Sequence, residues 1–410
     1  MRKIQTALTA LFALSLLFAG CATQKTGEPA ASTCPACPTC PPASTCPPAT
    51  APGQPAPFAR SLQPGSWSDL PGWNEDDVAA TWPVFMQSCR GMASKPHGPA
   101  WKRVCDLARA EEGRSGFDPR RFFEAHLRPY AILNGEGAAN GLITGYYEPL
   151  LRGSRNRSKS YDNPVRGVPD DLLTIDLASI YPELKDKRVR GRLVGNKVVP
   201  YWTRAEIEGK GERLPARNLL YVDDAVELFF LQVQGSGRVQ LAEGGMVRLN
   251  YADQNGHQYN SIGRVLIERG ELKPEEASMQ GIQAWARANP GRLDDVLNAN
   301  PSYVFFREVP DSKGGPIGAL GVPLTAERSI AVDPRSVPLG VPVFLATTRP
   351  NSSASLNRLV MAQDTGGAIK GAVRADFFWG FGKAAGEQAG RMKQSGRMWL
   401  LLPPEAVPKP

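Results

Sequence analysis

Two hydrophobic patterns divide the chain. Between residues 75 and about 133 apolar side chains recur every three or four positions, as on one face of a helix. This pattern predicts three helices, the first opening at Asp76-Asp77, the second around Trp101, and the third beginning at Asp118 with Pro119 in its first turn. From Leu142 onward the period shortens toward two, which is typical of β-strands.

Short β-rich runs separated by Gly, Asn and Asp follow. We expect strands at residues 197–201, 228–233, 246–251, 303–309, 329–332, 341–345, 359–362 and 398–402. One helical pair interrupts them, at residues 262–269 and 274–288. Many short strands predict a mainly β fold with N-terminal helices, built as a barrel or a sandwich.

The N-terminus carries an export signal. Basic residues at Arg2 and Lys3 precede an apolar run over residues 7–18, and a small-residue cleavage site follows. The apolar run is too short to cross a bilayer as a helix of the mature protein. We therefore expect residues 1–20 to be a signal peptide.

Cys21 is the expected first residue of the mature protein. The string from Leu17 to Cys21 resembles a bacterial lipoprotein box, which implies acylation of Cys21. Two or three acyl chains on Cys21 would anchor the protein far more firmly than a single acyl chain does. Because Ala22 rather than Asp follows, we expect a lipid anchor in the outer membrane that faces the periplasm.

Residues 21–65 read as a tether. Pro, Ala, Thr and Ser dominate them, and large apolar side chains are scarce, so they lack the surface needed for a core. Four cysteines are spaced like metal ligands, at Cys34, Cys37, Cys40 and Cys46. Each precedes a Pro, no His is near, and export places them in an oxidising environment, so we expect no metal there. Cys89 and Cys105 stand in predicted helices, and we expect them to form a disulfide.

The net charge of +8 suits a partner with negative charge. Anionic lipid, teichoic acid, peptidoglycan carboxylates and nucleic acid all qualify. Export and the lack of an RNP motif, a basic recognition helix or a phosphate loop argue against nucleic acid. We expect envelope partners instead, with the membrane contacted through the N-terminal lipid.

Three aspartates, Asp333, Asp364 and Asp376, stand beside apolar strands near the C-terminus. An Asp at a Gly-rich turn commonly has only a structural role, because its side chain hydrogen-bonds to the nearby backbone of the turn. Asp376 differs, because the aromatic run 377–379 follows it and desolvation would raise its pKa toward that of a general acid. A nearby carboxylate such as Asp364 would raise it further.

Two other polar motifs invite a function. Residues 144–149, Thr-Gly-Tyr-Tyr-Glu-Pro, combine the aromatics, hydroxyls and carboxylate that grip sugars, but they equally suit a strand with outward tyrosines. Residues 232–238 read as a buried strand ending in a Gly-Ser-Gly turn, without the features of a phosphate loop.

Elimination narrows the chemistry. The histidines lie far apart without metal spacing, at His97, His126 and His257. No serine stands in a nucleophile elbow, and the cysteines are expected to be oxidised. Carboxylate chemistry without a metal or other cofactor remains.

These motifs together resemble the membrane-bound lytic murein transglycosylase A family with its C-terminal three-aspartate domain. The resemblance spans about residues 75–402. It rests on residues 144–149, 229–238, 250–251, 364–371 and 374–380.

The resemblance implies a fold and a site. The fold would be a double-psi β-barrel domain, residues 66–150 and 301–405, with a smaller β-barrel inserted at residues 151–300 and a glycan groove between them. The catalytic acid falls on Asp376. The other expected groove residues are Thr144, Tyr146, Gln234, Gly235, Ser236, Asp333 and Asp364.

The family's reaction is cleavage of the MurNAc-β-1,4-GlcNAc bond with formation of 1,6-anhydro-MurNAc. Because the sugar's own C6 hydroxyl is the nucleophile, one aspartate suffices as acid and then base. Two alternatives stay open. One is a peptidoglycan hydrolase that pairs Asp376 with Asp364 or Asp333, and the other is a non-catalytic peptidoglycan-binding lipoprotein.

Overall fold

The computed structural model describes residues 62–184, 187, 189–310 and 314–407, and it is mainly β with several helices. The predicted signal peptide, Cys21 and nearly all of the tether lie outside the described residues. Within the described part of the chain, no helix has the length and apolar character needed to cross a membrane.

The three N-terminal helices are confirmed as α1 (Val78–Met92), α2 (Gly98–Glu111) and α3 (Pro119–His126). Asp77 begins α1 by accepting a hydrogen bond from the Ala80 N–H at 3.2 Å, and Asp118 begins α3 with Pro119 in the first turn. The helical prediction extended too far, because residues 128–132 form strand β2.

One large sheet contains eight strands in the order β1-β2-β17-β14-β15-β13-β16-β3. A further pairing of β17 with β3 links six of these strands into a closed circuit. The pairs β13–β15 and β16–β3 are parallel. The bounds are β1 Leu62–Pro64, β2 Arg128–Ile132, β3 Gly141–Glu148, β13 Ser329–Val332, β14 Pro342–Thr348, β15 Ser355–Asp364, β16 Arg374–Phe381 and β17 Lys393–Leu402, with helix α9 at Gly382–Arg391.

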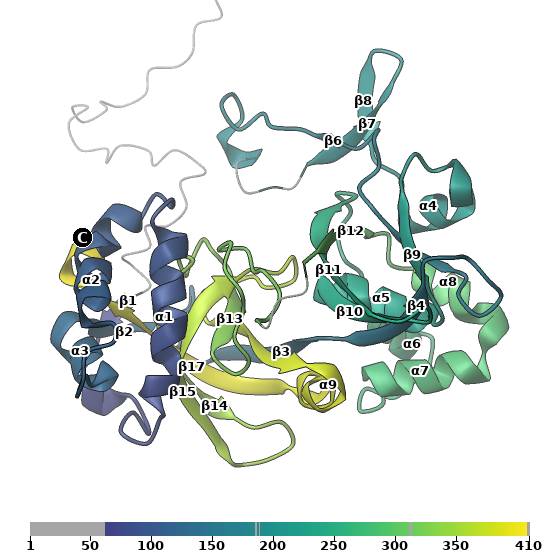
Figure 1. Ribbon diagram of the computed structural model, residues 1–410. Helices are drawn as coiled ribbons and strands as arrows, with labels where there is room; N and C mark the ends of the chain where they lie inside the picture. The colour runs from purple at the N-terminus through teal and green to yellow at the C-terminus, as the bar shows by residue number, and fades with distance from the viewer. Residues whose placement is uncertain (1–61, 185–186, 188, 311–313, 408–410) are drawn as a thin grey trace, which may run out of the picture. The chain divides into compact units, whose positions relative to one another are not determined.

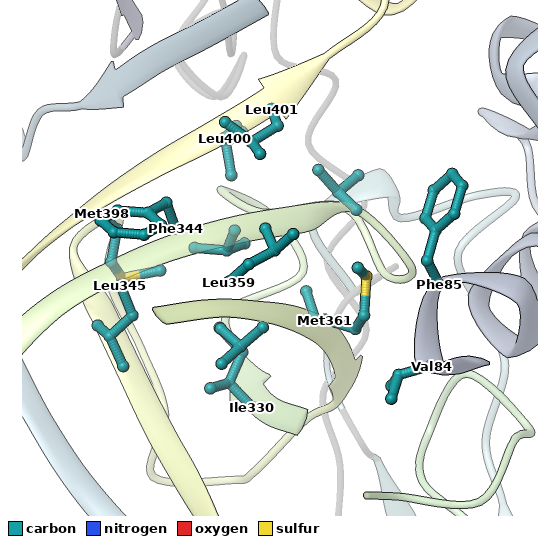
Figure 2. Packing of buried hydrophobic residues seen from close by; sticks show 14 of the residues in the cluster. Val84, Phe85, Ile330, Phe344, Leu345, Leu359, Met361, Met398, Leu400 and Leu401 are labelled. Atoms are coloured by element: carbon teal, nitrogen blue, oxygen red, sulfur yellow. The ribbon is translucent and has the colours of Figure 1, made fainter. Parts of the chain in front are cut away.

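The main hydrophobic core lies between this sheet and α1 (Figure 1). Val84 and Phe85 of α1 lie near Met361 of β15 in Figure 2, with Leu359 farther along the strand, and all four side chains are buried. Full burial of each such side chain contributes about 1.5–3 kcal/mol. The sulfur atoms of Cys89 on α1 and Cys105 on α2 lie 2.03 Å apart, as in a disulfide.

A second sheet has six strands in the order β12-β11-β10-β4-β9-β5, and a third has three in the order β6-β7-β8. The strand bounds are β4 Leu150–Ser154, β5 Asn163–Arg166, β6 Leu173–Thr174, β7 Arg190–Val194, β8 Lys197–Pro200, β9 Asn218–Val222, β10 Ser236–Leu241, β11 Met246–Gln254 and β12 Val304–Val309. The accompanying helices are α4 Arg204–Lys210, α5 Ala225–Gln234, α6 Ile262–Glu268, α7 Met279–Ala288 and α8 Leu293–Asn298.

The predicted strand at residues 228–233 is wrong, because this segment is helix α5. Asp224 begins the helix, accepting hydrogen bonds from the Val226 and Glu227 N–H groups at 2.7 and 3.0 Å. The run is apolar all round because α5 lies between two buried clusters, to which Leu228 and Phe229 belong separately. Periodicity alone does not distinguish such a helix from a buried strand.

Candidate active site

Strands β3 and β16 bring Thr144 and Asp376 together from opposite ends of the sequence. The two residues are register partners in the parallel pair, so their side chains extend to the same side of the sheet. The Thr144 hydroxyl donates a hydrogen bond to Asp376 Oδ1 at 2.6 Å. This is a short, charge-assisted geometry when the carboxyl is ionised.

Arg374 completes a short chain of hydrogen bonds. Its Nη2 donates to Thr144 Oγ1 at 2.9 Å, and its Nη1 donates to the backbone carbonyls of Ala375 and Leu142. Sequence reasoning quoted Arg374 as part of a motif but gave it no role. A signal existed, because residues two apart on a strand share a face.

Burial raises the pKa of Asp376 to about 6. The Thr144 hydrogen bond and the positive charge of Arg374 lower this pKa, and the charge of Asp364 raises it. The side chain stays partly accessible to solvent. A carboxyl group with these properties can be protonated near neutral pH and still reach a substrate.

The aromatic run does not desolvate Asp376 as a unit. Alternation along β16 places Phe378 on the face of Asp376, where its ring lies 5.1 Å from that of Tyr146. Phe377 and Trp379 point to the opposite face and belong to the main core. Of the three aromatic residues that follow Asp376 in sequence, Phe378 therefore shares its face of the sheet, whereas Phe377 and Trp379 do not.

Asp364 lies at the end of β15, and each of its carboxylate oxygens accepts a hydrogen bond. The Tyr146 hydroxyl donates to its Oδ2 at 3.1 Å, and the Ala319 N–H donates to its Oδ1 at 2.9 Å. Burial raises the pKa of Tyr146 well above its usual value, and the charges of Asp364 and Asp376 raise it further. Tyr146 therefore remains a neutral donor that joins β3 to β15.

Neither interpretation of residues 144–149 survives in full. Tyr146 and Tyr147 are both buried, so the strand does not carry outward tyrosines. Glu148 is completely buried and accepts from Arg248 Nε at 2.9 Å and from Arg238 Nε at 3.1 Å. Its oxygens are engaged by arginines, which rules out a sugar-gripping role for this carboxylate.

Asp333 is engaged differently from Asp376. Its Oδ2 accepts from Arg335 Nη2 at 2.6 Å and from the Gly371 N–H at 2.8 Å. Burial alone would raise the pKa of Asp333, but these donors outweigh burial and lower it. Asp333 therefore holds Gly371 in the loop between β15 and β16, and its lowered pKa does not suit an acid.

The Gln-Gly-Ser motif joins α5 to the site strand. Gln234 Oε1 accepts from the Tyr147 N–H at 3.1 Å. Gly235 ends α5 with φ +80°, the left-handed conformation that favours glycine at this position. Ser236 begins β10 opposite Asn250 and is buried. The structure thus brings Gln234 to β3, one residue beyond Tyr146.

No three His, Cys, Asp or Glu side chains within the described residues are grouped to hold an ion. His97 and His257 each pair with a backbone carbonyl, at 2.7 Å from Leu339 O and Tyr201 O.

Two family models match the chain. The MltA specific insert domain matches residues 142–307, and the 3D domain matches residues 328–402. Together these matches cover both strands that carry Thr144 and Asp376.

Characterised relatives are similar over most of their length. The membrane-bound lytic murein transglycosylase A of Escherichia coli K12 is 32% identical over 295 residues, which are 70% of this chain and 73% of that protein. A crystal structure of the E. coli protein with bound chitohexaose is similar at a TM-score of 0.61, with 26% identity and coverage of 84% of this chain and 94% of that one.

Two further solved structures are similar. MltA from Neisseria gonorrhoeae has a TM-score of 0.73 and 40% identity, covering 83% of this chain and 92% of that one. The lytic transglycosylase LtgG of Burkholderia pseudomallei has 48% identity and a TM-score of 0.57, covering 87% of this chain and 98% of that one.

Proposed function

Because the chain belongs to the membrane-bound lytic murein transglycosylase A family, it is a peptidoglycan lytic transglycosylase, and we propose that Asp376 alone serves as its acid and base. One observation carries this proposal. Asp376 is a partly accessible carboxyl group whose pKa burial raises to about 6 and whose Oδ1 receives the Thr144 hydroxyl.

In the first step Asp376 acts as an acid. Its protonated carboxyl donates to the oxygen that bridges C1 of MurNAc and C4 of GlcNAc. The bond from C1 to that oxygen breaks, and GlcNAc leaves with a free hydroxyl. The positive charge that develops on the MurNAc ring calls for nearby negative charge or dipoles, and we propose that the Asp364 carboxylate supplies part of it.

In the second step Asp376 acts as a base. The MurNAc C6 hydroxyl attacks C1, and the Asp376 carboxylate takes the hydroxyl proton. This restores the acid and leaves a 1,6-anhydro ring without consuming water. Because the nucleophile belongs to the same sugar, little further entropy is lost on reaching the transition state.

Peptidoglycan strands are the substrate, and we propose where they bind. Chitohexaose, the ligand of the E. coli structure, is a glycan oligomer. On this chain we assign the glycan strand to the side of β3 that carries Thr144 and Tyr146. Asp364, which accepts a hydrogen bond from Tyr146, lies on the same side. The Gln234-Gly235-Ser236 segment would border this path, because Gln234 is bonded to β3.

Asp333 takes a supporting role in this proposal. It fixes Gly371 and so the loop between β15 and β16, which carry Asp364 and Asp376. Its contact with the glycan, expected from the resemblance, would then be indirect.

We propose that the closed circuit of six strands is the double-psi β-barrel expected for the family. Residues 66–150 and 301–405 would form that domain, and residues 151–300 the inserted barrel. The match of the insert model to residues 142–307 supports an insertion with nearly these limits.

The family's membrane-bound name supports membrane association. We propose that Cys21 carries the lipid, that the protein resides at the outer membrane facing the periplasm, and that residues 22–65 span the distance to the glycan. Fractionation of cells that express Cys21→Ala tests this. We expect the variant in the soluble periplasmic fraction, and retention in the membrane contradicts the anchor.

Digestion of purified sacculi tests the reaction. Mass spectrometry should detect 1,6-anhydro-muropeptides. Asp376→Asn should reduce them at least about 100-fold, while Asp294→Asn, at an exposed position in α8, leaves them unchanged. Products heavier by one water would instead identify a hydrolase. Binding of sacculi without product from the wild-type protein would identify a binding protein.

A further inference from the structure

The hydrogen-bond chain that ends at Asp376 has a defined direction. Arg374 Nη2 lies 2.9 Å from Thr144 Oγ1, which in turn lies 2.6 Å from Asp376 Oδ1. A guanidinium carries only donors, whereas a hydroxyl has one proton to donate and lone pairs that accept. Thr144 therefore accepts from Arg374, and its only proton remains to be donated to an unprotonated Asp376 Oδ1.

We propose that Arg374 is a positioning residue for the reaction, which directs the Thr144 hydroxyl at Asp376 Oδ1 and thereby keeps the reacting proton on Oδ2. This inference rests on the proposed role of Asp376 as acid and base. Asp376 Oδ1 already accepts the hydroxyl proton of Thr144. A second proton bonded to Oδ1 would point toward that hydroxyl proton and be repelled by it. The acid form is thus limited to the tautomer with its proton on Oδ2.

The same arrangement serves both halves of the cycle. Thr144 donates to Oδ1 whether Oδ2 holds the proton or has released it, so the hydrogen bond need not reorganise between the acid and base steps. Donors that are already in place at the reacting group stabilise charge without reorganisation during the reaction.

Arg374 is itself fixed in place. Its Nη1 donates to Leu142 O of β3 and Ala375 O of β16, the two strands that carry Thr144 and Asp376. Burial lowers the pKa of Arg374 and the charge of Asp376 raises it, but a guanidinium remains a cation at physiological pH. A lysine would keep the charge but not the planar fork that contacts three acceptors.

A double-mutant cycle separates positioning from charge. We expect Arg374→Lys to lower kcat about tenfold to 100-fold, the loss that small misplacement of a catalytic group produces, with KM nearly unchanged. In a Thr144→Val background, Arg374→Lys should have almost no further effect, because the hydroxyl it directs is gone. Arg264→Lys, at an exposed position of α6, is the matched control.

The pH–rate profile provides a second readout, which a merely structural role would not shift. Among the described residues, the charged or titratable groups on the side of Asp376 include Tyr146 on β3, Asp364 on β15, Arg374 on its own strand and Lys393 on β17, the register partner of Thr144. The charge of Arg374 lowers the pKa of Asp376, and Arg374→Gln removes this charge. The basic limb of the variant's pH–rate profile should therefore move to higher pH. Arg374→Lys keeps the charge and should leave the limb in place while kcat falls.

The outcomes are distinct. Equal losses from Arg374→Lys in both backgrounds, or no loss in either, would overturn the inference. If Arg374→Lys is poorly folded by its thermal midpoint, Thr144→Ser decides, because serine keeps the hydroxyl and should retain kcat within about twofold, whereas Thr144→Val should not. If Asp376→Asn turns over near the wild-type rate, the proposed function fails, and that result is separate from any result on Arg374.

Discussion

Two carboxyl groups on neighbouring strands, the buried Glu148 and the partly buried Asp376, differ in how their arginines are placed. Glu148 on β3 accepts directly from Arg248 and Arg238, so each oxygen contacts a guanidinium. Asp376 on β16 accepts from Thr144, and Arg374 stands one hydroxyl farther away. Direct contact pairs Glu148 with two arginines and so joins β3 to β10 and β11. Indirect contact leaves Asp376 able to take up and release a proton.

The difference shows that burial alone does not make a catalytic acid. Burial disfavours the ionised form of any carboxyl group, and a cation in direct contact reverses that effect. At Asp376 the reversal is incomplete, because desolvation outweighs the hydrogen bond and the charge that oppose it. The hydroxyl that separates Asp376 from its arginine therefore belongs to the arrangement that leaves the pKa of this carboxyl group raised.

The largest effect should come from Asp376→Asn, which removes proton transfer and keeps the shape of the side chain. We expect turnover to fall by about 100-fold to 10,000-fold, the usual contribution of a general acid or base. Anhydro-muropeptide release from sacculi measures the rate, and co-sedimentation with sacculi should show that binding persists. Turnover near the wild-type rate would assign the acid elsewhere.

Glu148→Gln should instead damage the fold. It leaves Arg248 buried without its carboxylate, and breaking a buried ion pair in this way costs about 3–5 kcal/mol. Urea unfolding measures the change. Glu308→Gln is the control, because its pair with Arg155 is partly exposed and should contribute no more than about 1 kcal/mol. Similar losses in the free energy of unfolding from both variants would show that the buried Glu148 pairs contribute no more than an exposed pair.

Asp376→Asn should have the opposite effect on stability. In the folded protein the pKa of Asp376 is raised from 3.8 to about 6, so ionisation is penalised and stability falls as pH rises through that interval. At pH 7 the neutral Asn avoids this cost, and we expect it to stabilise the fold by about 1–3 kcal/mol. The gain should shrink as pH falls toward 3.8. Calorimetry at several pH values measures it, and a gain independent of pH would contradict the raised pKa.

The sequence singled out one member of this comparison, and its role as the acid stays a prediction. Asp376 was found from its apolar neighbours and the family motif, although only Phe378 of the aromatic run shares its face of the sheet. Glu148 was misjudged, because its two arginines come from β10 and β11, about a hundred residues downstream. Spacing along one strand predicts which side chains share a face, but it does not reveal what the partner strand brings to that face.

The secondary structure was also predicted correctly in some segments and wrongly in others. Local signals such as Asp118-Pro119 placed helix ends well, whereas residues 128–132 and 228–233 were assigned the wrong element. The first became a strand through pairing with β17, and the second became a helix between two clusters. Both errors arise where tertiary packing overrides local pattern.

The smallest expected effect tests whether Asp364 acts on Asp376 through its charge. Asp364 makes the weakest of the four contributions to the pKa of Asp376, and it raises that pKa. In Asp364→Asn the raising charge is removed, so Asp376 loses its proton at lower pH. The basic limb of the pH–rate profile should then move to lower pH, by less than the upward shift caused by Thr144→Val. Tyr146→Phe is the matched control, because it removes the Asp364 donor but neither carboxylate, and its limb should stay in place. A limb that stays fixed or moves upward in Asp364→Asn would exclude this coupling, and a fall in kcat without any shift would instead assign Asp364 to direct stabilisation of the sugar cation.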